Sequence, residues 1–197
     1  MARPPARELL DRVRHLHGVL DARGLKFAFM GGLAMNAWTV PAPTYDIDLC
    51  VELAEEGVPG LIRALESEGF VPPPTAWLES VGTAKFREFS VSWPFQEGLI
   101  PADFYLALQP FQREAMTRSR LAELDDGFST RILVPEDLLV YKLIAWRKKD
   151  QAAVERLLAV QRDLDWTCVR RWAQEYGVTD RLNEAVRDAG LEKPPRS

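Results

Sequence analysis

A glycine pair followed by two alternating aspartates is the feature that most restricts how this chain can fold. An apolar run at 27–29 leads into Gly31-Gly32, and the sequence Asp-Ile-Asp-Leu follows at 46–49. A strand, a glycine turn and a helix in this order leave free backbone N–H groups where a phosphate binds. Two carboxylates on the next strand then offer oxygen ligands. The order predicts a phosphate-binding turn followed by a metal-binding strand.

The aspartate pair is best understood from strand geometry. Residues two apart on a strand point to the same face, so Asp46 and Asp48 share one face while Ile47 and Leu49 share the other. A sheet can bury the aliphatic face and offer the acids to a cleft. Two like charges this close repel each other unless a cation lies between them, and Mg²⁺ takes carboxylate oxygens. The pair therefore indicates a metal site, with a solvated strand edge as the alternative.

A third aspartate repeats this pattern further along the chain. In the extended segment 99–108, apolar residues alternate with Asp103, which puts its carboxylate on the polar face of a strand. Placed side by side, Asp46, Asp48 and Asp103 would form the oxygen cage that two-metal phosphoryl or nucleotidyl transfer requires. Asp48 is expected to bridge both ions.

Composition limits the class of protein. The chain has 197 residues, of which 47% are hydrophobic, so it can bury a core as one domain or as two small domains in contact. A net charge of −4 argues against indiscriminate binding to nucleic-acid backbones. No apolar run of about 18 residues and no apolar signal segment occur, so we expect a cytoplasmic protein without a membrane span. Two distant cysteines predict no disulfide framework.

Periodicity predicts helices and strands that alternate in the first part of the chain, an α/β pattern, and a helical C-terminal half. Helices are expected at 6–23, 33–38, 58–68 and from Pro135 onward, and strands at 27–30, 45–51, 84–93, 99–108 and 129–134. We expect a core at 1–108 that carries the carboxylates, and a mainly helical region at 109–197 packed on it. The proline-containing ends, 2–5 and 193–197, should be loose.

Lys142 is the most informative cation. Its neighbours three and four positions away in the helix are all apolar, so an unpaired ammonium there would be costly and a partner is required. From the residues alone, an internal ion pair with a nearby acid and a snorkelling side chain both remain open. Asp150, two helical turns further on, either orients Lys142 or is a solvated helix residue.

The glycine pair, the alternating aspartates and the later acid resemble the nucleotidyltransferase superfamily with the polymerase-β-like minimal fold. Within it, the chain is most similar to the AbiEii/AbiGii toxin-type branch. That branch often reads Gly-Gly-x-Ala, then Arg-x-Thr-x-Asp-Ile-Asp-Leu, then a Pro-Glu-Asp-Leu helix with a Lys and a Lys-Asp. The matching residues, spread over 27–150, are Gly31, Gly32, Ala34, Thr44, Asp46, Ile47, Asp48, Leu49, Pro135, Glu136, Asp137, Leu138, Lys142, Lys149 and Asp150.

The resemblance implies an α/β (α+β) fold in which a small mixed sheet with flanking helices is followed by a helical C-terminal half. It also implies a nucleotidyltransferase that uses Mg²⁺ or Mn²⁺ to move a nucleoside monophosphate from an NTP to an acceptor hydroxyl, releasing pyrophosphate. The acceptor is an RNA end, a protein or a small molecule, and an antitoxin is a possible protein partner. The implied metal ligands are Asp46, Asp48 and Asp103. The implied catalytic residues are these three and Lys142, and the implied nucleotide-binding residues are Gly31, Gly32, Thr44 and Lys142.

Three departures from the branch pattern keep a second interpretation open. Ala42 replaces a usual Arg, Gly32 stands where many relatives have Ser, and Ala153 replaces a frequent second acid. Lys85 and Arg87 could supply some of the charge missing at position 42, if they do not form a solvated strand face. The rival function is a non-catalytic nucleotide-binding module that acts through a protein partner. A metal-dependent phosphohydrolase ranks last, because the chain lacks the His-Asp clusters usual in such sites.

Overall fold

A computed structural model describes residues 6–72, 78–81, 84–96 and 98–191. The ends at 2–5 and 193–197, which we expected to be loose, lie outside these ranges. Within the described ranges, no helix is both long and apolar enough to cross a bilayer.

The strands are β1 (Phe27–Phe29), β2 (Ile47–Val51), β3 (Glu79–Val81), β4 (Phe86–Phe95), β5 (Gly98–Leu106), β6 (Arg120–Asp125) and β7 (Phe128–Ile132). The helices are α1 (Ala6–Asp21), α2 (Gly31–Trp38), the short 3-10 helix η1 (Glu55–Gly57), α3 (Val58–Ser67), α4 (Pro110–Arg118), α5 (Pro135–Ala145), α6 (Lys148–Val160), α7 (Trp166–Glu175) and α8 (Thr179–Asp188).

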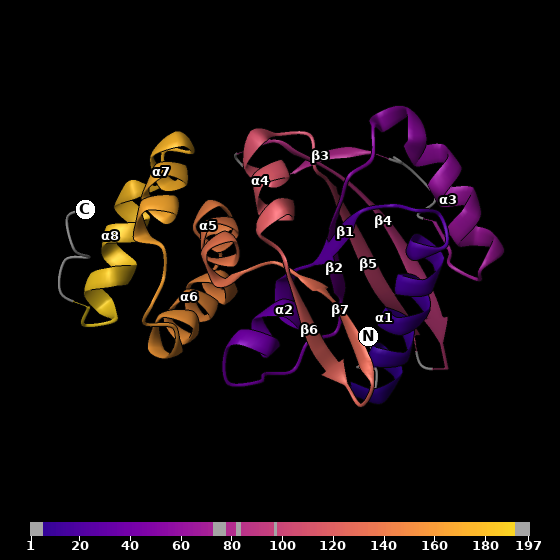
Figure 1. The fold of residues 1–197 in the computed structure, drawn as a ribbon, viewed down its shortest axis with the longest axis horizontal. Helices are drawn as coiled ribbons and strands as arrows, with labels where there is room; N and C mark the ends of the chain where they lie inside the picture. The colour runs from indigo at the N-terminus through magenta and orange to yellow at the C-terminus, as the bar shows by residue number, and fades with distance from the viewer. Residues whose placement is uncertain (1–5, 73–77, 82–83, 97, 192–197) are drawn as a thin grey trace.

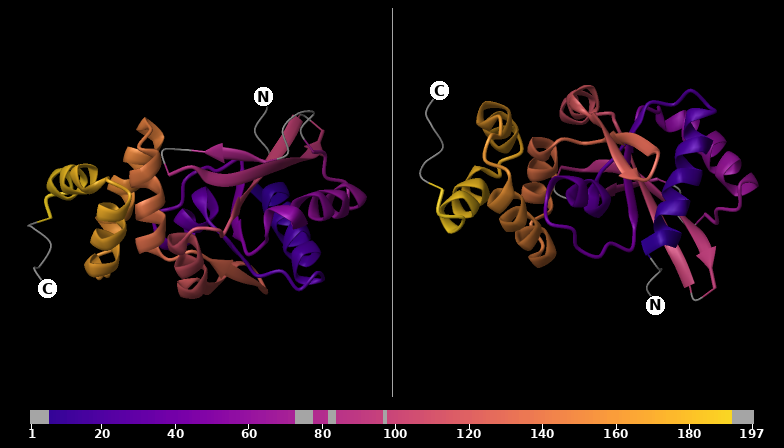
Figure 2. Two further views of the ribbon diagram at one scale, coloured as in Figure 1. Left: turned by 90° about the horizontal axis from the view of Figure 1, so that it is seen from above. Right: turned by 60° about the horizontal axis from the view of Figure 1, so that its bottom comes forward.

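The strands form one mixed sheet in the order β3-β4-β5-β2-β1-β7-β6 (Figure 1). Strand β1 runs antiparallel to β2 and parallel to β7, and β2 runs parallel to β5. The remaining neighbours, β3 with β4, β4 with β5 and β6 with β7, pair antiparallel. Helices α1 and α3 lie at one end of the molecule, and α7 and α8 lie at the other (Figures 1 and 2). The predicted α/β fold with a helical C-terminal half is confirmed.

The two faces of the sheet carry different side chains. One face is apolar and packs on α1, where the rings of Phe27 and His17 lie 5.3 Å apart. On this face Phe89 stacks on Phe104 with ring centroids 4.5 Å apart, and Leu49 is the register partner of Phe104. Side chains alternate along a strand, so the opposite face receives the polar residues of β2 and β5.

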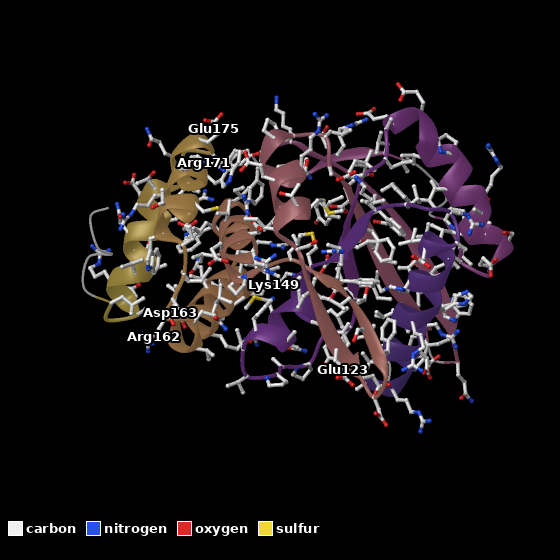
Figure 3. The ribbon with its side chains drawn as sticks, viewed as in Figure 1. Glu123, Lys149, Arg162, Asp163, Arg171 and Glu175 are labelled. Atoms are coloured by element: carbon white, nitrogen blue, oxygen red, sulfur yellow. The ribbon has the colours of Figure 1, made fainter. Side chains whose placement is uncertain are left out.

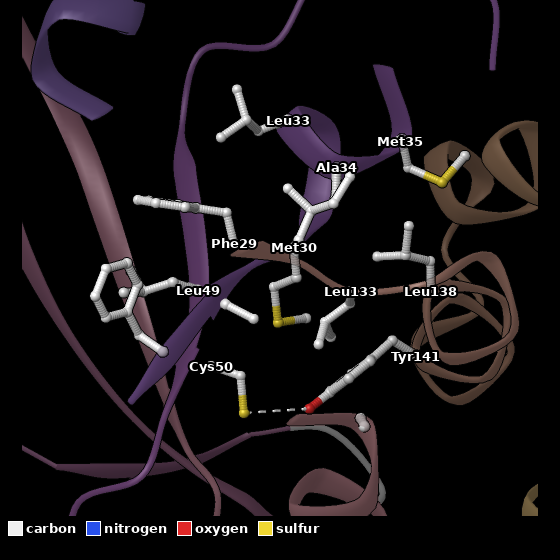
Figure 4. Close-up of a cluster of buried hydrophobic side chains, with 14 of the residues drawn as sticks. Phe29, Met30, Leu33, Ala34, Met35, Leu49, Cys50, Leu133, Leu138 and Tyr141 are labelled. Atoms are coloured by element: carbon white, nitrogen blue, oxygen red, sulfur yellow. Dashed lines mark hydrogen bonds between the residues drawn. The ribbon is translucent and has the colours of Figure 1, made fainter. Parts of the chain in front are cut away.

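Buried side chains fill the space between the sheet, α2 and α5, as Figure 4 shows. Met30 and Leu138 belong to this cluster, and the hydroxyl of Tyr141 donates a hydrogen bond to Cys50 Sγ at 4.0 Å. Burial raises the pKa of the Cys50 thiol to about 12. Cys50 and Cys168 are both buried free thiols, so neither forms a disulfide.

Two boundaries differ from the sequence expectation. Helix α2 begins at Gly31, so the glycine pair forms the first turn of the helix and does not precede it. Strands β6 and β7 belong to the same sheet as β1, although they follow the boundary expected near residue 108. The change from sheet to helices therefore falls at Pro135, where α5 begins.

The junction between α5 and α6 is a third difference. Helix α5 ends at Ala145, and Trp146 adopts a left-handed conformation with φ of 49°. Helix α6 begins at Lys148 and packs against α5. Lys142 and Asp150 therefore do not lie two turns apart on one helix, as the sequence indicated. The reversal of the chain brings them face to face.

Candidate functional site

A cavity of about 620 Å³ opens between the polar face of the sheet and helices α2, α5 and α6. It is lined by every residue to which the sequence analysis assigned a catalytic, nucleotide-binding or metal-binding role: Gly31, Gly32, Thr44, Asp46, Asp48, Asp103 and Lys142. The charged residues around it are Asp46, Asp48, Asp103 and Asp150, and Lys142, Arg147, Lys149 and Arg156. The acids of the sheet thus lie across the cavity from the cations of α5 and α6. The chemical roles assigned to the predicted residues remain predictions.

A second cavity, of about 470 Å³, lies near the C-terminal end of α1. Several of its polar groups have partners in the protein. Lys26 forms an ion pair with Glu52 at 3.3 Å, and His17 Nδ1 lies 2.8 Å from Thr130 Oγ1. We therefore regard the cavity beside the aspartates as the candidate site.

Strand pairing positions the three aspartates. Asp48 of β2 and Asp103 of β5 are direct register partners in the parallel pair, and Asp46 precedes β2. Asp46 and Asp103 each accept a hydrogen bond from a hydroxyl group. Thr44 Oγ1 donates to Asp46 Oδ1 at 3.0 Å, and Ser90 Oγ donates to Asp103 Oδ1 at 2.6 Å. Thr44 therefore supports Asp46 directly, beside any contact it makes with a ligand.

The carboxylates affect one another electrostatically. Burial, together with the negative charges of Asp46 and Asp103, raises the pKa of Asp48 from 3.8 to about 7, against the opposing effect of Lys142 and Lys149. Burial also raises the pKa of Asp103, although its hydrogen bond from Ser90 acts in the opposite direction. A bound divalent cation would relieve this repulsion, and carboxylate oxygens are the ligands that Mg²⁺ takes.

The aspartates do not form a closed cage in this structure. Among the residues that it describes, no group of three or more His, Cys, Asp or Glu side chains is arranged to hold a metal ion. Asp46 and Asp103 are instead hydrogen-bonded to Thr44 and Ser90. The donor chemistry fits a hard divalent cation, and the metal role of the three aspartates stays a prediction.

The two glycines are required by close approach to these residues. Gly31 has φ of +57°, and a Cβ atom there would lie 1.7 Å from Asp48 Oδ2. A Cβ atom on Gly32 would lie 2.2 Å from Thr44 Oγ1. The first turn of α2 also leaves backbone N–H groups without partners inside the helix. The glycines therefore bring the N-terminus of α2, with its free backbone N–H groups, close to Asp48 and Thr44.

Lys142 pairs with Asp150, one of the alternatives that the sequence left open. Lys142 Nζ lies 3.1 Å from Asp150 Oδ1, and the side chain of Asp150 is fully buried. Arg147 Nε donates to Asp150 Oδ2 at 2.6 Å, and the backbone N–H of Arg147 donates to the same oxygen at 3.1 Å. Burial alone would raise the pKa of Asp150, but Arg147 and Lys142 together lower it.

Other polar residues near the aspartates were not found by sequence reasoning. Ser90 is the register partner of Asp103, and only the pairing of β4 with β5 shows this. Lys149 lies between the C-terminal helices and the sheet (Figure 3). Its charge lowers the pKa of Asp48 and of Asp103, which indicates that it faces both. Lys149 belongs to the Lys-Asp motif at 149–150, which by itself indicates no role for it.

Lys85 and Arg87, which could have supplied some of the charge missing at position 42, do not reach the cavity. Arg87 Nε forms an ion pair with Glu55 at 2.8 Å, and Lys85 precedes β4 and is exposed. Neither residue lines the cavity. Ala42 itself is held by the Asn36 side chain, which accepts a hydrogen bond from its N–H at 2.9 Å and donates to its carbonyl at 2.8 Å.

Solved structures with a similar α/β fold include an antibiotic adenylyltransferase and an antibiotic-resistance factor. The lincosamide antibiotic adenylyltransferase LnuA, bound to lincomycin, aligns with a TM-score of 0.55 and 12% identity, over 81% of this chain and all of LnuA. The antibiotic-resistance factor ANT(2'')-Ia aligns with a TM-score of 0.51 and 16% identity, over 93% of this chain and 94% of its own.

A third structure, JHP933 from Helicobacter pylori, aligns with a TM-score of 0.51 and 11% identity, over 94% of this chain and 82% of its own. At these identities the similarity shows the fold alone. No protein-family model and no curated protein sequence matches the chain. Placement in the AbiEii/AbiGii branch therefore stays a prediction.

Proposed function

We propose that this protein is a nucleotidyltransferase that moves a nucleoside monophosphate from an NTP to an acceptor hydroxyl. The observation that carries the proposal is the division of charge around one cavity. Asp48 and Asp103 of the sheet, with Asp46 just before β2, lie on one side, and Lys142 and Lys149 of the helices lie on the other. The N-terminus of α2 also lines this cavity. A nucleoside triphosphate with a divalent cation carries matching charges.

Asp46, Asp48 and Asp103 are the residues that would hold Mg²⁺ or Mn²⁺. When bound, the metal would lower the barrier by neutralising charge on the phosphates and on the attacking oxygen. The backbone N–H groups of Gly31 and Gly32 bind phosphate oxygens at the helix terminus. Lys142 binds the triphosphate as a second cation.

Asp150 positions the cations in this proposal. Its buried carboxylate fixes Lys142 through an ion pair and holds the backbone and side chain of Arg147 at the start of α6. Because two cations share one carboxylate, Lys142 keeps positive charge available to a phosphate. Removing Asp150 would free Lys142 to move.

The transfer step conserves atoms and charge. The acceptor hydroxyl oxygen forms a bond to the α-phosphorus, and the bond from the α-phosphorus to the bridging oxygen of the β-phosphate breaks. Pyrophosphate leaves with that oxygen, and the hydroxyl proton passes to a carboxylate at the site or to water. Asp48, whose pKa of about 7 lies near neutrality before ligands bind, lies on the side of the cavity where this proton is released.

For the acceptor we favour a small molecule with a free hydroxyl. LnuA is described as an adenylyltransferase for lincosamide antibiotics, and its fold covers most of this chain. The net charge of −4 disfavours a large RNA acceptor. An RNA end or a protein, as in a toxin paired with an antitoxin, is the other outcome of the test.

The test incubates the protein with Mg²⁺, a cell extract and each of the four NTPs, labelled at either the α- or the γ-phosphate. We expect the α-label, and not the γ-label, to appear on an acceptor, and the small-molecule, RNA and protein fractions identify its class. Asp48→Asn should abolish transfer, whereas Asp163→Asn, which changes an exposed aspartate after α6, should not. Nucleotide binding without transfer by the wild type would instead support the non-catalytic module.

A further inference from the structure

Arg156 is a cation of the cavity that neither the sequence pattern nor the proposed reaction uses. It lies on α6 and lines the cavity together with Lys149 and Ala153, which precede it by seven and three positions. Residues at this spacing share one face of a helix. Arg156 is thus about two turns further along that face than Lys149, and Ala153 between them has no charge.

Among the residues that the structure describes, no carboxylate pairs with the guanidinium of Arg156. Its Nε atom is buried and makes no hydrogen bond, and no ion pair joins it to another of the described residues. The other arginine of the cavity, Arg147, is paired with Asp150. Leaving a charged donor without a partner beside a cavity is costly. An anionic ligand would supply the missing acceptor.

The position of Arg156 indicates which part of the ligand it would contact. Lys149 and Asp150, the ion-pair partner of Lys142, lie at the start of α6, whereas Arg156 lies about two helical turns further along the same helix. Bond breaking in the proposed reaction occurs at the α-phosphate, which must lie at the aspartates. The terminal phosphate of an extended triphosphate then lies furthest from them, toward the distant cation.

We propose that Arg156 binds the terminal phosphate of the NTP and makes the site prefer triphosphates to diphosphates. A planar guanidinium can donate two parallel hydrogen bonds to one phosphate, which a lysine cannot do. This inference rests on the proposed function and adds a specificity determinant to the same site. It also gives a reason for Ala153, because an acid three positions before Arg156 would pair with the guanidinium and neutralise it.

The test measures the binding of two ligand pairs by calorimetry with Mg²⁺. One pair is α,β-methylene-ATP and ADP, and the other is α,β-methylene-GTP and GDP. We expect the wild type to bind a triphosphate more tightly than its diphosphate. Charge-assisted hydrogen bonds are worth about 10- to 100-fold in affinity. Arg156→Gln should lose this preference by weakening triphosphate binding only. Ala153→Glu should have the same effect, since Arg156 remains but is paired.

The matched control is Arg162→Gln, which removes an exposed arginine just beyond the end of α6 (Figure 3). It should bind like the wild type, and thermal unfolding should show that all variants fold. The inference would be overturned if Arg156→Gln kept its preference for the triphosphate, or if its binding of both ligands weakened equally. The labelled-transfer assay tests the proposed function separately. Failure of the wild type to bind either pair would contradict both.

Discussion

The ammonium group of Lys142 and the buried carboxylate of Asp150 lie 3.1 Å apart across the junction of α5 and α6, and Arg147 donates to the same carboxylate. Removing Lys142 therefore does not strand Asp150 without a partner. We expect Lys142→Ala to lose most transfer activity while its melting temperature without nucleotide stays the same or rises. Differential scanning fluorimetry beside the transfer assay measures both. A loss of about 3–5 kcal/mol in unfolding free energy would mean that Lys142 is structural.

The raised pKa of Asp48 predicts how stability depends on pH. The unfolded pKa is 3.8 and the folded pKa is about 7, so the folded apo protein favours the protonated form. The stabilisation of the folded state that comes from its tighter binding of the Asp48 proton is fully present below pH 3.8, and it is lost as pH rises through 7. Asp48→Asn does not titrate, so it should melt a few degrees above the wild type at pH 8 and match it near pH 4. The reverse order at pH 8 would contradict the burial and repulsion described for Asp48.

Metal addition gives a separate prediction for the aspartates. Mg²⁺ should raise the melting temperature of the wild type at pH 8, because a ligand that binds only the folded state stabilises it. Asp48→Asn and Asp103→Asn should respond much less, since each removes one charged ligand. Asp163→Asn is the matched control. An equal response from all four proteins would show that Mg²⁺ binds elsewhere.

Gly31 allows a test of close packing against backbone strain. Gly31 and Gly127 have similar positive φ values, +57° and +68°, but only at Gly31 would a Cβ atom meet another group, Asp48 Oδ2. Replacing either glycine with Ala should lower the unfolding free energy by about 1–2 kcal/mol, because a residue with a Cβ atom is strained in the left-handed conformation. Gly31→Ala should in addition lose the stabilisation by Mg²⁺ and the transfer activity. Retention of both would show that Asp48 moves aside without consequence.

An ion pair with a buried carboxylate should stabilise the packing of α4 against α5. Asp137 is fully buried, and Arg118 donates to both of its oxygens, at 2.5 and 3.2 Å. Arg118→Met should lower the unfolding free energy by about 3–5 kcal/mol, because it leaves the Asp137 carboxylate unpaired. The exposed pair of Arg14 and Asp125 is the control, and Arg14→Met should cost less than about 1 kcal/mol in urea unfolding.

The parts of the fold that the sequence predicted well depend on local pattern. Helix α1 has strong apolar periodicity, and Gly24 follows it with φ of +66°, as expected at a helix C-terminus. The alternation around Asp103 predicted β5 and the side on which its carboxylate lies. Asp46 and Asp48 could be associated with Gly31 because their order along the chain is distinctive.

The missed features depend on tertiary structure. Strand β6 is an edge strand that is half charged, so its sequence has little apolar alternation. The break at Trp146 has neither glycine nor proline to indicate it, although it determines that Lys142 meets Asp150. The place of Arg156 depends on how α6 packs against α2, and nothing within its own helix reveals that contact.

The near balance of charge around the cavity has a kinetic consequence. Of the described residues, four carboxylates and four cationic side chains line it, so these walls have almost no net charge. Long-range attraction of a nucleotide anion should therefore be weak, and capture should depend on contacts made after the ligand has arrived. The association rate should then change little with ionic strength, in contrast to sites that draw phosphates in through an excess of lysine and arginine.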